Sequence, residues 1–200
     1  MNSVLNTRPF PDNIDVNIYV NNDSNDINEI HDPHTEITYT YDSFFDLSDT
    51  YKSLYDRADG DYVFFLEDDD YIKPYFFNHL DLTFDINYVN YISEPLIKEH
   101  GPIAGIKITR QPTELEDMYD YYTFRQHHKS RYFQLSQLIF KKSMLESFPT
   151  GNDIHNDIRL FESFNKLSSL KYIAHPLWVQ TTDGQDNISF DHLNKDPRYV

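Results

Sequence analysis

Four consecutive acidic residues, Glu67-Asp68-Asp69-Asp70, follow directly on an apolar run at residues 62–66. A short apolar run between polar segments is typical of a buried strand, so the acids begin where that strand ends. Adjacent carboxylates at the edge of a core repel one another and lose part of their hydration. Both effects are unfavourable, and a bound cation offsets them. Mg²⁺ and Mn²⁺ prefer such oxygens and bridge them to phosphates. The segment therefore predicts metal-assisted chemistry on a phosphorylated substrate.

Asp157 is a second carboxylate whose surroundings suit chemistry. Apolar residues recur at helical spacing through residues 154–167, and Asp153 stands where an N-cap would precede that helix. Asp157 then lies in the early turns, where the helix dipole favours an ionised carboxylate. An ionised, positioned carboxylate can accept a proton from a substrate hydroxyl. The plainer alternative is a helix-start acid without a chemical role.

The composition limits the classes of function. The 200 residues have a formal net charge of -16, contain no cysteine and are 39% hydrophobic. We therefore expect one folded domain without disulfides or zinc–sulfur sites. The acidic balance argues against a broad nucleic-acid surface. No apolar stretch approaches the roughly 20 residues of a membrane span and the N-terminus does not resemble a signal peptide, so we expect a cytoplasmic protein.

The periodicity of apolar residues predicts alternating strands and helices. Strands are expected at 14–20, 36–41, 62–66, 103–108, 136–140 and 171–181. Helices are expected at 43–58, from Pro74 through Phe84, at 141–148 and at 154–167. This alternation indicates a single α/β domain over 1–200, with a mixed, mostly parallel sheet flanked by helices and an irregular tail from 183.

Two polar turns are expected at one edge of this sheet. Ligands of α/β sheets bind beyond the carboxyl ends of the strands. The acidic tetrad at 67–70 occupies such an end, and so does the turn at 21–23 after strand 14–20. The two turns lie side by side if their strands are neighbours.

Residues 58–74, ADGDYVFFLEDDDYIKP, resemble the core of GT-A glycosyltransferases of the large family 2 type. That family has a phrase of the form A-x-G-[DE]-Y-[hydrophobic]₃-L-D-x-D-D-x₃-P. Gly60 and Pro74 match it in an ungapped alignment, and Glu67 replaces the first aspartate of the metal-binding DxD. The resemblance implies a GT-A-like, Rossmann-like fold.

The same resemblance implies roles for the four acids. Glu67 and Asp69 are expected to bind the metal with Asp70 in support, and Asp68 is assigned to the donor. The acids by themselves leave Asp68-Asp69-Asp70 open as an alternative metal-binding triplet, but Pro74 fixes the register that favours the first assignment.

Two further segments resemble the family in the expected order. Residues 20–26, VNNDSND, resemble its V-D-D-G-S-x-D turn, which holds the nucleotide, and this implies donor contacts from Asn22 and Asp26. Residues 151–164, GNDIHNDIRLFESF, resemble the region that carries the catalytic base of inverting enzymes, which assigns that role to Asp157.

The chain departs from the family pattern in two places. The family begins with a strand and a long helix before the turn at 20–26, and Met1 stands too close to this turn to supply both. A shortened N-terminus is therefore expected, with a remnant strand at 3–6. Tyr51-Lys52 replaces an Arg-Asn pair, and Lys52 is expected to contact phosphate. A trimmed enzyme, a fragment and a relative that binds without turnover all stay open.

The combined motifs predict a metal-dependent glycosyltransferase that uses Mn²⁺ or Mg²⁺. It would move a sugar from a nucleotide-diphosphate sugar to an acceptor hydroxyl with inversion. Two alternatives stay open: a module of the same fold that binds nucleotide-sugar without turnover, and an acidic metal-binding structural protein.

The sequence does not specify the sugar, the nucleotide or the acceptor. The net charge favours a glycan, a lipid-linked sugar or a protein as acceptor over modified DNA, although residues 125–131 form a dense basic segment. His175 and His192 are candidates for an additional metal ligand. For each, the plainer alternative is an ordinary histidine of the surface or core.

Overall fold

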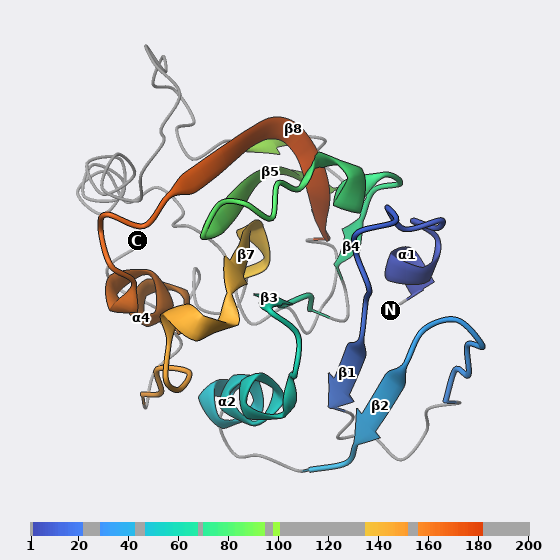
Figure 1. Cartoon of the computed structure of the whole chain (residues 1–200), viewed down its shortest axis with the longest axis horizontal. Helices are drawn as coiled ribbons and strands as arrows, with labels where there is room; N and C mark the ends of the chain where they lie inside the picture. Colours follow the sequence, from blue (N-terminus) through green and yellow to red (C-terminus); the bar gives the residue numbers. More distant parts are fainter. Residues whose placement is uncertain are drawn as a thin grey trace.

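A computed structural model of the chain describes residues 2–21, 29–42, 47–67, 70–94, 98–100, 135–151 and 156–181. Its helices are α1 (Asn2–Leu5), α2 (Leu47–Arg57), η1 (Phe76–His79), η2 (Leu135–Gln137), η3 (Lys142–Met144) and α4 (Asn156–Ser163), of which the η elements are 3₁₀ helices. Its strands are β1 (Ile18–Asn21), β2 (Ile37–Thr40), β3 (Tyr62–Phe64), β4 (Tyr71–Ile72), β5 (Ile86–Glu94), β6 (Lys98–His100), β7 (Leu138–Lys141) and β8 (Leu170–Thr181) (Figure 1).

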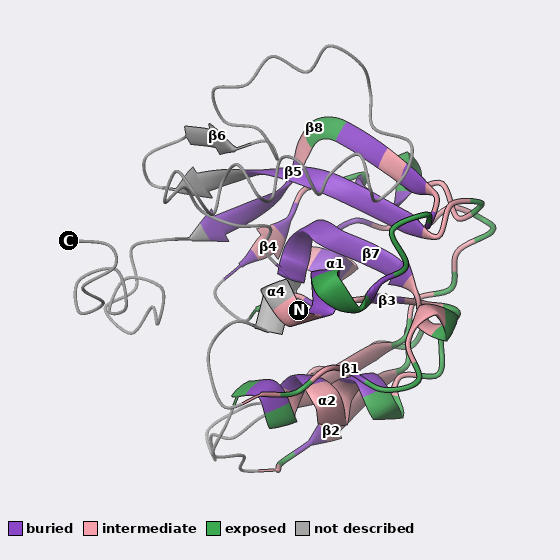
Figure 2. Cartoon of the chain, turned by 90° about the vertical axis from the view of Figure 1, so that its left-hand side faces the viewer, coloured by how far each residue is buried: buried purple, intermediate pink, exposed green. Residues whose placement is uncertain are grey.

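The larger sheet is built around β5 and β8. Its strand order is β3-β7-β5-β8-β4, and β6 pairs with β5 beside this path. β8 runs parallel to β5 along its whole length, from the pair Ile86–Leu170 to the pair Glu94–Thr181. Burial is concentrated in β5, β7 and β8 (Figure 2). A strand buried on both faces reads as a continuous apolar run rather than an alternating one.

The α/β class and the mixed sheet expected from the sequence are confirmed, but the direction of pairing needs correction. Of the strand pairs that the described residues form, β5–β8 and β1–β2 are parallel. The pairs β3–β7, β4–β8, β5–β6 and β5–β7 are antiparallel. The sheet is therefore not mostly parallel within the described part of the chain.

The cause of this difference is β5, which the periodicity did not predict. Two buried asparagines interrupt its apolar run. Both are satisfied internally: Asn87 accepts a hydrogen bond from the Asp81 backbone N–H at 2.8 Å, and Asn90 donates to the carbonyl of Ala174 at 2.9 Å. Without β5, the strands were expected to be joined by helical crossovers, which impose parallel pairing.

The helices are shorter than the sequence pattern predicts. The helix expected from Pro74 through Phe84 is the four-residue η1, and the helix expected at 141–148 is η3. Residues 2–5 form α1 instead of the remnant strand expected at 3–6, and Val4 of this helix packs in a buried cluster with Trp178 and Phe77. The strand expected at 103–108, the basic segment at 125–131 and the tail from 183 lie outside the described residues.

Alternate residues of the strands enter two apolar clusters, one on each face of the larger sheet. On the first face, α2 and α4 cover Val63, Phe65 and Phe140. On the second face, α1 and η1 pack against residues such as Ile139 and Trp178. Each fully buried large side chain contributes roughly 1.5–3 kcal/mol to folding, so α2 and α4 are fixed by packing rather than by helix propensity.

β1 and β2 form a separate two-stranded parallel sheet beside α2 (Figure 1). Asn17 and the Tyr19 hydroxyl donate hydrogen bonds to Asp59 Oδ1, at 3.2 and 2.8 Å. Arg8, which follows α1, donates hydrogen bonds to both carboxylate oxygens of Asp32 at 2.6 Å. This pair joins the segment before β1 to the segment before β2. The hydrogen bond from Arg8 lowers the pKa of Asp32 to about 2.

The start of β5 carries an ion pair that joins three strands. Asp85 accepts hydrogen bonds from Lys141 Nζ at 2.8 Å and from the Ser169 hydroxyl and backbone N–H at 2.8 and 3.0 Å. The hydrogen bond from Lys141 is the main cause that lowers the pKa of Asp85 below the ordinary aspartate value of 3.8. The ionised carboxylate therefore stabilises the native state.

We predict that Asp85→Asn lowers the free energy of unfolding at pH 7 by about 1 kcal/mol, since the pair is partly exposed and screened. Because the native pKa is depressed, this contribution is present above pH 3.8 and is lost as the pH falls through the lowered pKa. Urea titrations from pH 7 to pH 2 measure it, with Asp12→Asn at an exposed position as control. A difference that stays constant down to pH 2 would contradict this account.

Candidate functional site

The acid turn, residues 67–70, joins β3 to β4. Glu67 stands three residues beyond the end of β3, and the Asp70 backbone N–H donates to the Glu67 carbonyl at 3.2 Å. β3 pairs with β7 and β4 pairs with β8, so the larger sheet holds both ends of the turn. Asp68 and Asp69 lie outside the described residues.

Asp70 fastens the acid turn to β8. Its side chain is buried, with 5% of the residue surface exposed, and Trp178 Nε1 donates a hydrogen bond to Oδ2 at 3.0 Å. Trp178 is itself completely buried and lies 4.7 Å from the ring of Tyr91. A buried carboxylate is tolerated only with hydrogen-bond donors. The structure thus places Asp70 beneath the turn, in contact with the second cluster.

Glu67 lies on the opposite, solvent-exposed side of the turn. The hydroxyl of Tyr51, from α2, donates a hydrogen bond to its Oε1 at 2.8 Å. Tyr51 is 8% exposed and packs against Phe65 and Phe148, with ring centroids 5.3 and 5.8 Å apart. A buried phenol therefore orients a carboxylate that solvent and ligands can reach.

The chemistry of these donors fits a hard divalent cation, because Glu67 offers an exposed carboxylate at the end of a strand. Among the described residues, no group of three histidine, cysteine or acidic side chains is arranged to hold a metal. Two of the four acids, Asp68 and Asp69, are outside that set. The metal site of Glu67, Asp69 and Asp70 therefore stays a prediction.

The predicted base, Asp157, is the second residue of α4 and lies in its first turn. This agrees with the position in the helix that the sequence predicts. Its side chain is outside the described part, as are the predicted donor-binding residues Asn22 and Asp26. Lys52 forms an ion pair with Asp56 one turn along α2. Its proposed contact with phosphate stays a prediction.

One face of α2 connects the acid turn with the segment that leads into α4. One turn before Tyr51, the buried Ser48 accepts a hydrogen bond from the Gly151 backbone N–H at 3.1 Å. A Cβ at Gly151 would overlap the guanidinium of Arg159 in α4, so a larger residue here requires this side chain to shift. The sequence pattern identifies Tyr51 as an apolar position of a helix. It does not predict the hydrogen bond from its hydroxyl to Glu67, because the two residues are 16 positions apart and no local pattern links them.

His175, a candidate extra metal ligand, lies beside another histidine. It is exposed where the β5–β8 register shifts, and its ring centroid is 5.5 Å from that of His79 in η1. Within the described chain it belongs to no group of three potential metal ligands. His192 lies outside the described residues.

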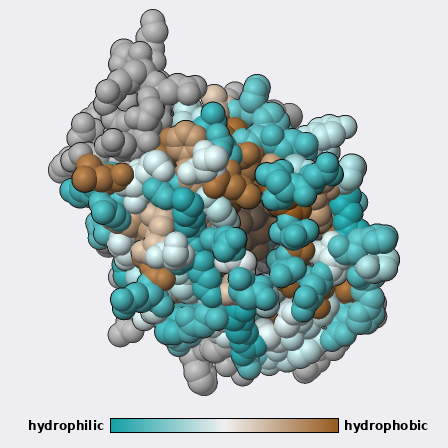
Figure 3. Space-filling view, viewed as in Figure 1, coloured by the Kyte–Doolittle hydropathy of each residue, from teal (hydrophilic) through white to brown (hydrophobic). Residues whose placement is uncertain are grey.

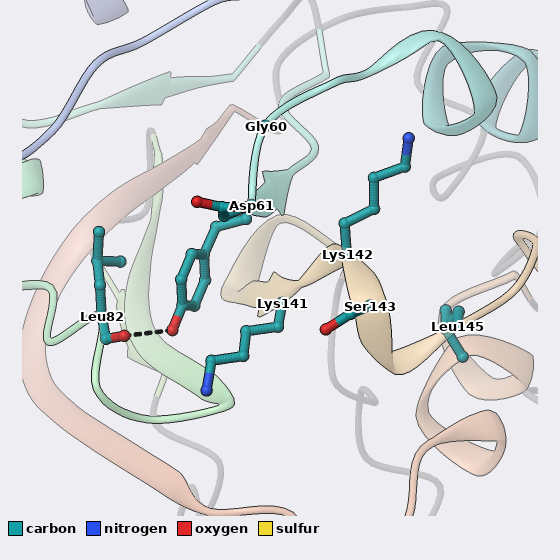
Figure 4. Close-up of a pocket in the computed structure, with 8 residues that line it drawn as sticks. Gly60, Asp61, Leu82, Lys141, Lys142, Ser143 and Leu145 are labelled. Carbon is teal, nitrogen blue, oxygen red and sulfur yellow. Dashed lines mark hydrogen bonds between the residues drawn. The ribbon is translucent and has the colours of Figure 1, made fainter.

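A surface hollow of about 630 Å³ lies at the other end of β3, near Gly60 and Asp61 (Figure 4). Two of its lining residues are lysines, and each of them has a partner within the protein. Lys141 pairs with Asp85, and Lys142 donates to the Ala58 carbonyl. The residues that line the hollow do not include the acid turn, and its lysines bind one carboxylate and one backbone carbonyl. Polar residues cover most of the face in Figure 3, and apolar residues gather mainly toward its upper middle.

Comparison with known proteins gives a fold. No family model and no curated protein matches the sequence. The structure is similar to that of S. aureus TarS residues 1–349, with a TM-score of 0.53 and 13% identity over 74% of this chain and 44% of that chain. The complex of TarS 1–349 with UDP-GlcNAc aligns over 78% and 44% of the two chains, at 13% identity and a TM-score of 0.48.

At this identity the similarity shows the fold alone, and that fold is GT-A-like, as the sequence predicts. The chain spans less than half the length of the TarS structures that it matches. Among the described residues, the helices are too short or too polar to cross a membrane.

We predict that Trp178→Phe destabilises the protein by about 1–3 kcal/mol, because Asp70 stays buried and loses its indole donor. Asp70→Asn replaces the carboxyl acceptor by an amide, so the loss from Trp178→Phe should be smaller in that background, with a coupling of about 0.5–3 kcal/mol. Chemical denaturation of the four proteins of this double-mutant cycle measures the coupling. Additive effects would mean that the hydrogen bond does not hold the turn.

Proposed function

We propose that this protein is a glycosyltransferase that takes its sugar from a nucleotide-diphosphate donor. The observation that carries the proposal is the acid turn at the carboxyl end of β3 in a GT-A-like fold, with Glu67 exposed and Asp70 buried beneath it. In open α/β sheets this edge is where ligands bind.

The class of donor is supported by the TarS comparison. TarS shares the fold of this chain, and a crystal structure of TarS holds UDP-GlcNAc. The nucleotide and sugar used by this chain are open, because the predicted nucleotide turn carries Asn21 and Asn22 in place of two acids. Asparagine offers both donors and acceptors to a base edge.

Carboxylates of the acid turn would hold a Mg²⁺ or Mn²⁺ ion, with Glu67 and Asp69 as ligands and Asp70 in support. When bound, the cation supplies positive charge that stabilises the leaving diphosphate. The protein's own part is to present Glu67 in a fixed orientation, through Tyr51, on a turn that Trp178 fastens to β8.

Asp157 is the proposed general base. At the start of α4 its carboxylate is favoured in the ionised form. It would take the proton of an acceptor hydroxyl as that oxygen bonds to the anomeric carbon and the bond from this carbon to the phosphate oxygen breaks. A single displacement inverts the configuration. A glycan, a lipid-linked sugar or a protein is the proposed acceptor class, ahead of modified DNA.

We predict that Asp157→Asn lowers kcat by about 10²–10⁴-fold, because the base is lost while the donor site stays intact. The KM for the donor should stay unchanged. Release of nucleoside diphosphate from UDP-, GDP- and dTDP-sugars with Mn²⁺ measures both constants. Glu162→Gln is the matched control, because it neutralises an exposed acid of the same helix.

The outcomes separate the open alternatives. Full turnover by Asp157→Asn would exclude this residue as the base. Binding of a nucleotide-sugar by the wild type without any release of nucleoside diphosphate would indicate a binding module. Thermal stabilisation by Mn²⁺ without an effect of any nucleotide would indicate an acidic metal-binding structural protein.

A further inference from the structure

Tyr51 joins the interior of the protein to the exposed side of the acid turn. Its ring is 8% exposed, whereas Glu67, which accepts its hydrogen bond at 2.8 Å, is exposed. The phenol is therefore directed from the first cluster outward to a carboxylate at the surface. An exposed glutamate has many side-chain conformations, and a fixed donor at one oxygen selects among them.

Packing gives the Tyr51 hydroxyl a fixed position. Its ring meets Phe65 at an interplanar angle of 76° and Phe148 at 46°. These three rings come from α2, from the residue after β3 and from the segment before α4. A tyrosine side chain has only two rotatable angles before its ring is set, so ring contacts on two sides locate the hydroxyl.

The neighbouring hydroxyls on the same face of α2 have different partners. Tyr55, one turn further, donates to the carbonyls of Lys142 and Leu145 at 2.7 and 2.8 Å. Ser48, one turn earlier, accepts from Gly151 at 3.1 Å. Of these three hydroxyl groups, that of Tyr51 contacts an acid of the turn. Tyr55 thus serves as the comparison, because it is also a buried tyrosine of α2 whose hydroxyl donates at a similar distance, but to backbone carbonyls instead of an acid.

We propose that Tyr51 is a positioning residue, which holds the Glu67 carboxylate in the orientation that binds a divalent cation together with a nucleoside diphosphate. The inference rests on the proposed function, because the cation is part of it. A donor that holds one oxygen of a ligating carboxylate fixes its orientation, and loss of such a partner weakens metal affinity by about 10–100-fold. The role belongs to the hydroxyl, since phenylalanine would preserve the ring contacts.

The test compares Tyr51→Phe with Tyr55→Phe by titration calorimetry of Mn²⁺ in the presence of UDP, with GDP and dTDP in parallel. We expect Tyr51→Phe to weaken cation-dependent nucleotide binding by about 10–100-fold. Tyr55→Phe should bind as the wild type does while its melting temperature falls. A merely structural role for Tyr51 would lower the melting temperature in the same way but leave binding unchanged.

A double-mutant cycle with Glu67→Gln identifies the route of the effect. If Tyr51 acts through Glu67, Tyr51→Phe adds no further loss of binding in the Glu67→Gln background. Wild-type affinity in a folded Tyr51→Phe protein, or equal losses in both backgrounds, would overturn the inference alone. No binding of Mn²⁺ with any of the nucleotides by the wild type would instead overturn the proposed function, and the positioning role with it.

Discussion

The hydrogen bond from the Trp178 indole to Asp70 is the interaction on which the acid turn depends. A carboxyl group that is 5% exposed needs a hydrogen-bond donor in the core, so the indole and the turn must be placed together. Trp178 is fixed in turn by β8, which pairs with β5 along the whole length of that strand. The pairing of β5 with β8 thus determines where Asp70, the last acid of the turn, is held.

The acid turn is held from both faces of the larger sheet. On the second face Asp70 reaches the cluster of Trp178, and on the first face Glu67 reaches Tyr51 of α2. Neighbours in a strand point to opposite faces. Alternation after β3 places Glu67 on the face of Phe65, and alternation before β4 places Asp70 on the face of Ile72. Glu67 and Asp70 therefore have different environments, although only two residues separate them in the sequence. One acid of the turn is buried against the core, and another is exposed to solvent.

The sequence predicts the parts of this arrangement that local patterns determine. The apolar run before Glu67 gives β3, and the helical period around Tyr51 gives α2. The sequence does not predict β5, because Asn87 and Asn90 interrupt the apolar run that would indicate a buried strand. Their hydrogen-bond partners lie in the turn at Asp81 and in β8, which only the structure brings together. Lys52 was the residue of α2 expected to serve the site, while the neighbouring position is the one that contacts the acid turn. Hydrogen bonds between elements distant in sequence have no period, so Tyr51 and Trp178 emerge only from the fold.

The separation of the β1–β2 sheet from the larger sheet has a dynamic consequence. A pair of short strands is marginally stable by itself, and most residues of β1 and β2 are only half-buried. Near β1, the side chains of Asn17 and Tyr19 fasten this sheet to Asp59, just before β3. We therefore expect this unit to open with a smaller free energy than the β5–β8 centre, and its amide protons to exchange with solvent through local opening. The two sheets would then be cooperative units of unequal stability.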